Sequence, residues 1–170
     1  MTEIKDSSRP WTKLIGLAVL AIAVGVGIWR WREKQWWDDM VAPTMTLINY
    51  TGQEVEASLH FSEFPNPGEG ASYGMGPYAG GSKSSCCVPM PTHWRPGIKM
   101  VVKYHMGNWP EGKEETKVIE LPEYPDGRPG ELYVLVHSET DVEVLSSIYD
   151  PLHERWPGRV KGFAHNPAKK

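Results

Sequence analysis

The sequence predicts an all-β domain, an antiparallel β-sandwich or open barrel, preceded by one N-terminal transmembrane helix. Three observations support this fold class: an apolar run near the N-terminus, alternation of apolar and polar residues farther along, and turn residues between the alternating stretches. The 170 residues suffice for one folded domain and are too few for two ordinary ones. We expect a cytoplasmic N-terminus, a transmembrane helix, an interfacial segment, a β-sandwich domain and a basic tail, over residues 1–10, 11–31, 32–43, 44–150 and 151–170.

The transmembrane helix is predicted from Leu14–Trp29, 16 residues without a polar or charged side chain. At 1.5 Å per residue this run covers roughly 24 Å, and its flanks extend the helix to about 31 Å, the thickness of a bilayer core. A cleaved signal peptide is the alternative, with Ala21 and Ala23 at the candidate cleavage site. We favour an anchor because the apolar run continues to Trp29 and ends in tryptophan and arginine, which suit the membrane interface.

The orientation of the helix is only weakly determined by the flanking charges. Three Lys or Arg residues precede the apolar run and three follow it, and the free amino terminus favours an inside N-terminus. This orientation places the β-domain in the periplasm. Four tryptophans within residues 29–37 suit a segment at the membrane surface, so residues 32–43 are expected to be interfacial, with a polar stalk as the alternative.

The β-domain is predicted from a period of two, the pattern of a sheet with one buried face. Glu54–Phe61 alternates without exception, and Ile98–His105 alternates with one exception at Val101. Shorter strands are expected around Val118 and at residues 132–136 and 142–145. Residues 44–50 form a further strand, joined to Glu54–Phe61 by a turn containing glycine, so these two strands are predicted to pair as a hairpin.

A stretch rich in glycine and proline, Pro65–Lys83, is predicted to be a long loop, and such loops are often functional. It is not a phosphate-binding loop, because Gly81 is followed by Ser82 before Lys83. Nor do a strand and a helix flank it, as a dinucleotide site requires. Loops and exposed aromatic residues dominate recognition. The candidate binding residues are therefore in this stretch and in a later turn: Glu69, Tyr73, Tyr78, Lys83 and Trp109.

Composition argues against several classes of function. A formal charge of −3 and a pI of about 6.1 disfavour nucleic acid as a partner. Two cysteines cannot build a disulfide framework or a four-ligand zinc site, and the six histidines match no metal motif. There is no Gly-x-Ser-x-Gly nucleophile motif. We therefore expect no metal, no cofactor, no small-molecule substrate and no catalytic residues.

The adjacent Cys86 and Cys87 have two interpretations. The first is a pair of small hydrophobic residues at the start of a strand, where one thiol is buried and its neighbour is exposed. The second is a redox or crosslinking pair joined by a vicinal disulfide. Nothing else in the sequence supports a redox cycle.

Residues 86–97, Cys-Cys-Val-Pro-Met-Pro-Thr-His-Trp-Arg-Pro-Gly, resemble the signature of a bacterial family known as domain of unknown function 3304. The resemblance covers roughly residues 45–165. His93 and Tyr104 depart from the pattern, which more often has a basic residue and Trp there. In structural terms, Pro and Gly form a turn, Trp packs and Arg is held by a carbonyl or carboxylate. The residues of this structural motif are Cys86, Cys87, Trp94, Arg95, Pro96 and Gly97.

The resemblance implies a small anchored or lipid-attached envelope protein of Gram-negative bacteria. Together with the predicted transmembrane helix, it leads us to expect a single-pass inner-membrane anchor. Several family members are encoded beside type VI secretion effectors, including lipases, and are taken to be immunity proteins. The implied role is a periplasmic domain that binds a toxin and blocks its active site. A structural or accessory envelope protein without a toxin partner is the alternative, and a redox protein using Cys86 and Cys87 is a weaker one.

The charge distribution agrees with a protein partner. Residues 42–150 contain 15 Asp and Glu against 7 Lys and Arg, a net charge of −8. Such a surface accelerates capture of a basic partner, although acidic surfaces also serve ordinary solubility. The tail, residues 151–170, has a net charge of +4. We expect it either to contact anionic headgroups or to fold back on the acidic domain.

Overall fold

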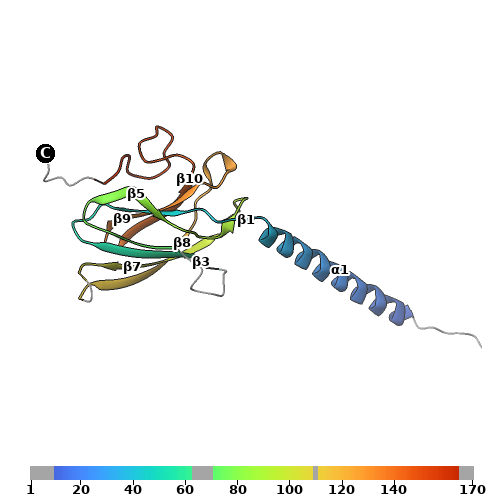
Figure 1. The fold of residues 1–170 in the computed structure, drawn as a ribbon. Helices are drawn as coiled ribbons and strands as arrows, with labels where there is room; N and C mark the ends of the chain where they lie inside the picture. The colour runs from blue at the N-terminus through green and yellow to red at the C-terminus, as the bar shows by residue number, and fades with distance from the viewer. Residues whose placement is uncertain (1–9, 63–70, 109–110, 165–170) are drawn as a thin grey trace, which may run out of the picture. The chain divides into compact units, whose positions relative to one another are not determined.

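The computed structural model describes residues 10–62, 71–108 and 111–164. The chain divides into two compact units that meet between Asp39 and Met40. The first contains one long helix, α1 (Pro10–Asp38), and the second is built from β-strands (Figure 1). The predicted fold class, an all-β domain with a single N-terminal helix, is confirmed.

Helix α1 has the length and composition of a membrane-spanning helix. Its stretch Leu14–Arg32 has a mean hydropathy of 2.0 over 19 residues, and none of it is buried in protein. A signal sequence meets the same criterion, so both expectations for this segment agree with the helix. The helix continues without interruption to Asp38, and most of the segment predicted to be interfacial is therefore helical.

The second unit contains two four-stranded sheets and a two-stranded ribbon. The first sheet has the strand order β10-β9-β2-β5 and is called the β2 sheet; the second has the order β4-β3-β7-β8 and is called the β3 sheet. The ribbon pairs β1 with β6. The strands are β1 (Met40–Val41), β2 (Met45–Asn49), β3 (Val55–Phe61), β4 (Ala71–Met75), β5 (Ala79–Ser85), β6 (Met90–Pro91), β7 (Lys99–Met106), β8 (Lys113–Glu120), β9 (Glu131–Ser138) and β10 (Asp141–Ser147).

The two sheets enclose the hydrophobic core between them. Alternate residues of β3, from Val55 to Phe61, and of β7, from Met100 to Met106, are buried on the inner face of the β3 sheet. The hydroxyl of Tyr104 on β7 donates a hydrogen bond of 2.7 Å to the carbonyl oxygen of Glu139, in the turn between β9 and β10. The two layers are therefore joined by a polar contact as well as by apolar packing.

The predicted hairpin between residues 44–50 and Glu54–Phe61 is wrong. These segments form β2 and β3, which lie in different sheets: β2 pairs with β5 and, in parallel, with β9, whereas β3 pairs with β4 and β7. Asn49 directs the crossing, because its side-chain amide donates to the carbonyl of Gln53 at 2.6 Å and accepts from the N–H of Thr51 at 2.9 Å. The burial patterns also differ, since every residue of β2 is buried and β3 alternates.

The prediction of a long glycine-rich loop is wrong for residues 71–83, which contain β4 and most of β5. Glycine serves close packing here. A Cβ at Gly80 would lie 2.7 Å from the Cα of Ile48 on the paired strand, and one at Gly81 would collide with the ring of Phe163. Glycine at these positions lets the backbone of β5 approach its neighbours. Because glycine has no side chain, β5 lacks the alternating apolar pattern by which a strand is predicted.

The C-terminal segment, residues 151–164, packs on the outer face of the β2 sheet. Trp156 is only 5% exposed, and its ring meets Tyr133 edge-on with 4.8 Å between the ring centroids. Its apolar neighbours are residues of the β2 sheet: Ile48, Tyr133, Leu135 and Leu145. The β2 sheet is therefore covered on both faces, which explains why its central strands lack alternation.

Ion pairs hold the same segment at two points. Arg159 binds Asp141 at 2.7 Å and Glu143 at 3.0 Å, and Arg155 pairs with Asp126. Of the two expectations for the basic tail, the described part follows the second, because it folds back on acidic residues of the domain.

Replacing Trp156 with alanine tests the contribution of this segment to stability. Trp156→Ala is expected to lower the free energy of unfolding by about 3 kcal/mol, because it removes a buried aromatic side chain. Urea unfolding of the full chain in detergent, followed by circular dichroism of the β-domain, measures the change. Leu152→Ala in the same segment is the control: Leu152 is 73% exposed, so the variant should stay within about 0.5 kcal/mol of wild type.

The carboxylates that bind Arg159 make this contact sensitive to pH. Burial raises the pKa of Glu143, but hydrogen bonds from His137 and Arg159 outweigh burial and leave the pKa below its ordinary value. The hydrogen bond from Arg159 likewise lowers the pKa of Asp141. A carboxyl whose pKa is lower in the folded state adds stability above its unfolded pKa, and this stability is lost as the pH falls through the folded value.

Arg159→Gln is therefore expected to lower the melting temperature at pH 7. Its deficit relative to wild type should shrink as the pH falls below about 4, where the carboxylates become protonated in wild type as well. Thermal unfolding between pH 7 and pH 3 measures this convergence, with Lys161→Gln as a control for loss of one surface charge. A deficit that stays constant over the whole range would contradict the assignment.

Candidate interaction surface

The outer face of the β3 sheet is lined with polar side chains. Register places the row Glu56, His105 and Glu114 directly across β3, β7 and β8, and the next row contains Ser58, Lys103 and Thr116. On β8 every residue of the outer face is exposed: Glu114, Thr116, Val118 and Glu120. In contrast to the β2 sheet, this sheet presents a face that can contact a partner.

A hollow of about 470 Å³ lies on this outer face. His105 is 8% exposed and lies between Glu56 and Glu114 in the register. The ammonium of Lys103 is 3.0 Å from the carboxylate of Glu114. The hollow is lined by these side chains and by small neighbours: Glu56, Ala57, Ser58, Ser72, Lys103, Tyr104, His105 and Glu114.

A second hollow of about 320 Å³ lies at the end of the same sheet, where β7 turns into β8. Gly112 shapes this end, because a Cβ there would lie 2.2 Å from the ring of His105. Only glycine lets the connection pass so closely over the histidine. The lining comes from three connections between strands: Gln53, Met106, Gly107, Asn108, Glu111, Gly112, Lys113 and Glu139.

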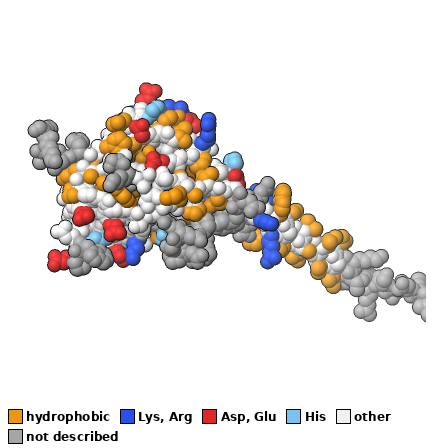
Figure 2. All heavy atoms as spheres, viewed as in Figure 1, with side chains coloured by type: hydrophobic (Ala, Val, Ile, Leu, Met, Phe, Trp, Pro, Cys, Tyr) orange, Lys and Arg blue, Asp and Glu red, His pale blue; other side chains and the backbone are white. Residues whose placement is uncertain are grey.

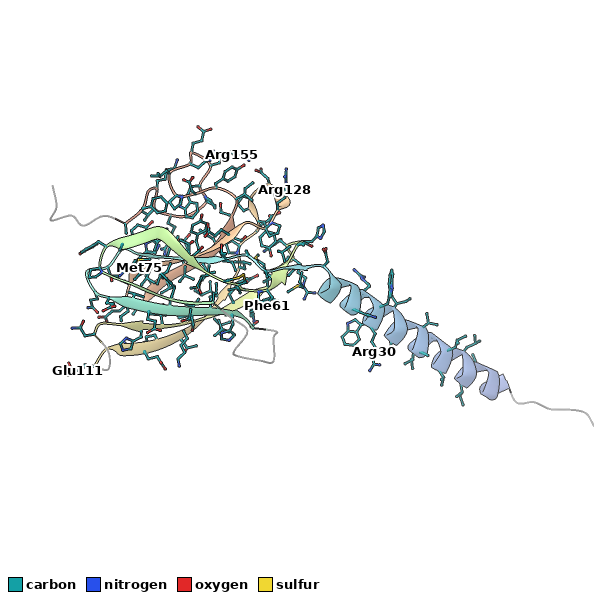
Figure 3. The ribbon with its side chains drawn as sticks, viewed as in Figure 1. Arg30, Phe61, Met75, Glu111, Arg128 and Arg155 are labelled. Atoms are coloured by element: carbon teal, nitrogen blue, oxygen red, sulfur yellow. A yellow bond between two sulfur atoms is a disulfide. The ribbon has the colours of Figure 1, made fainter. Side chains whose placement is uncertain are left out.

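Carboxylates are concentrated at this end of the domain, which we call the acidic end. It contains six carboxylates and two ammonium groups, a net charge of −4: Glu54, Glu56, Glu111, Glu114, Glu115, Glu139, Lys103 and Lys113. Figure 2 shows red carboxylates gathered at the lower left of the domain, and Figure 3 labels Glu111 there. Such a concentration attracts a basic surface.

Local contacts shift the pKa values of three groups at the acidic end. Lys113 and Glu115 are 2.6 Å apart, and the hydrogen bond between them raises the pKa of Lys113 and lowers that of Glu115. Burial, followed by the charge of Glu115, raises the pKa of Tyr104. Both shifts favour the charged forms of Lys113 and Glu115, so this ion pair persists at neutral pH.

Three of the five predicted binding residues are described, and they lie on separate parts of the domain. Glu69 and Trp109 lie outside the described residues. Tyr73 is on β4 and Lys83 is on β5, which are edge strands of different sheets. Tyr78 lies between those strands, at the same end of the domain as Glu54, and its N–H donates to the carbonyl of Thr51 at 2.9 Å. The acidic end was missed because its carboxylates come from separate connections, and only strand register reveals that they are close.

Cys86 and Cys87 are joined by a disulfide. Cys86 is exposed and Cys87 is half-buried, so the first interpretation, with one thiol buried in a strand, is wrong. The pair follows the end of β5 at Ser85, and alternation between two faces does not apply outside a strand. The disulfide is thus accessible between β5 and the ribbon.

Trp94, Arg95, Pro96 and Gly97 form the turn that leads into β7. The indole N–H of Trp94 donates to the carbonyl of Leu121 at 2.8 Å, and the N–H of Gly97 donates to the carboxylate of Glu120 at 2.9 Å. Gly97 has a φ of +87°, which favours glycine. Arg95 and Pro96 are exposed. These contacts tie the turn to the end of β8, so the motif positions the β3 sheet.

Within the described residues, no group of three or more His, Cys, Asp or Glu side chains is placed to hold a metal ion. The histidines lie on separate elements: His105 is on β7 and His137 is on β9, where it contacts Glu143 at 3.2 Å. The arrangement supports binding through surface charge and gives no argument for a particular reaction.

Comparisons with known proteins identify a family but no individual relative. Searches of curated proteins and of solved structures give no significant match. The family described as protein of unknown function DUF3304 matches residues 48–144. The match begins on β2 and ends on β10, and it contains the cysteine pair, the turn at Trp94–Gly97 and the acidic end. The chain therefore belongs to the DUF3304 family.

Proposed function

We propose that this protein is a membrane-anchored periplasmic binding protein that neutralises a secreted toxin by protein–protein contact. The toxin is a type VI secretion effector, such as a lipase, and the bound domain covers the toxin's active site. The protein itself has no catalytic role in this proposal. Helix α1 supplies the anchor, and the β-domain supplies the binding surface.

The acidic end is the observation that carries the proposal. Its net charge of −4 is gathered on one end of an open sheet face, next to two hollows that can receive side chains. Binding surfaces that capture a partner rapidly use complementary charge to raise the association rate. A basic surface around a toxin's active site is the partner that this chemistry favours.

Neutralisation is tested with the product of the gene adjacent to this one, expressed in the periplasm of a sensitive strain. Co-expression of the full chain is expected to restore growth. The double charge reversal Glu111→Lys, Glu114→Lys should slow association of the purified proteins about tenfold at low salt and less at high salt. The reversal Glu123→Lys, Glu154→Lys, at exposed carboxylates outside the acidic end, is the matched control.

Two outcomes would contradict this proposal. Sensitivity that is unchanged by the full chain would favour a structural or accessory envelope protein without a toxin partner. Equal association rates for both charge reversals would show that the acidic end does not contribute to recognition of the toxin.

The exposed disulfide favours a second candidate, a redox protein that uses Cys86 and Cys87. In that case a substrate dithiol is oxidised to a disulfide as the two cysteines are reduced to thiols, and loss of both sulfurs abolishes function. We expect instead that the Cys86→Ser, Cys87→Ser variant, once shown to fold by circular dichroism, still protects cells. Loss of protection with the fold intact would support the redox candidate.

A further inference from the structure

Strand β8 is an edge strand, and among the described strands only β7 pairs with it. The strand orders place four strands at sheet edges: β4 and β8 in the β3 sheet, and β5 and β10 in the β2 sheet. An edge strand presents a row of backbone N–H and C=O groups that can pair with another chain. Whether it can do so depends on its length, its regularity and what lies beside it.

The other three edges are poor templates for an added strand. Strand β4 has five residues, and β5 has an irregular register and contacts Phe163 at Gly81. Strand β10 shifts register after Asp141, which also binds Arg159 of the C-terminal segment. Strand β8 has eight residues without glycine or proline and pairs with β7 in continuous register. It is therefore the one long, regular edge among the described strands.

The hydrogen-bond pattern shows which groups of β8 face the open side. The N–H of Leu121 donates to the carbonyl of Ile98 at 2.8 Å. Because hydrogen bonds between two antiparallel strands recur at every second residue, the odd-numbered residues of β8 bond to β7. The hydrogen bonds between β3 and β7 agree with this assignment. The N–H of Gly107 donates to the carbonyl of Glu54 at 2.9 Å, so the odd-numbered residues of β7 bond to β3 and its even-numbered residues bond to β8. The even-numbered residues direct their N–H and C=O groups away from β7: Glu114, Thr116, Val118 and Glu120.

The side chains of these same residues specify the chemistry of an added strand. Val118 is 61% exposed and lies across from Val101, so an apolar side chain placed beside it would bury hydrophobic surface. Glu114 is exposed and belongs to the acidic end, so a lysine or arginine beside it would be attracted. Opposite these two positions, an antiparallel strand has residues four apart in its own sequence.

We propose that β8 accepts an extended basic segment of the partner protein as an added antiparallel strand. An apolar, preferably β-branched residue of that segment lies opposite Val118, and a lysine or arginine four residues later lies opposite Glu114. Backbone hydrogen bonds supply the affinity, and the two side-chain positions supply the selectivity. The inference rests on the proposed function for its partner, a toxin, and adds the mode of contact.

A second copy of this chain fits the edge less well. Antiparallel pairing of two β8 strands turns one copy end for end, so that the two β1 strands lie at opposite ends of the joined sheet. Chains anchored in one membrane through helices that directly precede β1 approach with their β1 ends on the same side. A partner segment carries no such restriction.

The test uses the full chain in detergent and the peptide acetyl-Ser-Val-Thr-Thr-Thr-Lys-Ser-amide, in which Val and Lys have the required spacing. Amide hydrogen exchange is followed by NMR as the peptide is titrated to millimolar concentration. We expect exchange to slow about tenfold at Thr116 and Val118, and to change little at Lys117, whose N–H already bonds to β7. A peptide with Glu in place of Lys should bind more weakly.

Variants separate the backbone contact from the fold. Thr116→Pro removes an outward N–H without breaking the β7 ladder and should weaken peptide binding at least tenfold, whereas Thr116→Ala should bind within about twofold of wild type. Val118→Glu, which leaves the backbone intact, provides a second variant and should also weaken binding. Melting temperatures establish that each variant is folded.

The outcomes distinguish this inference from the proposed function. Absence of protection at the even-numbered amides, or normal binding by Thr116→Pro, overturns strand addition even if the chain neutralises the toxin. Protection that appears without peptide and rises with protein concentration assigns the edge to a second copy and also overturns it. Peptide binding in a chain that fails to neutralise the toxin supports β8 as a strand acceptor and refutes only the proposed toxin.

Discussion

The structure depends on an unequal burial of its two sheets. A sheet with two apolar faces needs a cover on each, and the β2 sheet obtains its second cover from the C-terminal segment through Trp156 and Arg159. The β3 sheet needs none, because its outer face is polar. One side of the sandwich is thus covered by the chain itself, and the polar outer face of the other side is left exposed.

This asymmetry also decides which backbone edge is available. The C-terminal segment contacts both edge strands of the β2 sheet, at Gly81 on β5 and at Asp141 on β10. In the β3 sheet, β8 has charges on its side chains and a regular backbone. Charged edge strands commonly prevent aggregation. Under the proposed function, the same charges, concentrated with one sign at the acidic end, favour a basic chain over a neutral or acidic one.

Alternation predicted β3 and β7 well, because one face of each strand is polar and the other is buried, but it did not predict β4 in the same sheet. The pairing of β2 was predicted wrongly. A strand that is buried on both faces has no period of two, and the strands that pair with β2, which are β5 and β9, come from distant parts of the chain. Glycine-rich β5 was missed because Gly80 serves close backbone contact. The candidate site could not be predicted for a related reason: Glu54, Glu111 and Glu139 are brought together only by register.

The chain path links anchoring to recognition. One residue separates α1 from β1, and three residues separate β1 from β2, so the chain enters the sandwich at the end where β7 begins. The acidic end lies where β7 finishes, eight residues along the strand, or roughly 25 Å away at 3.3 Å per residue. This distance within the β-domain exceeds the Debye length of about 10 Å, so charges near the point where α1 joins the domain are largely screened from the carboxylates of the acidic end. Under the proposed function, the domain is attached at one end of the sandwich and meets its partner at the other.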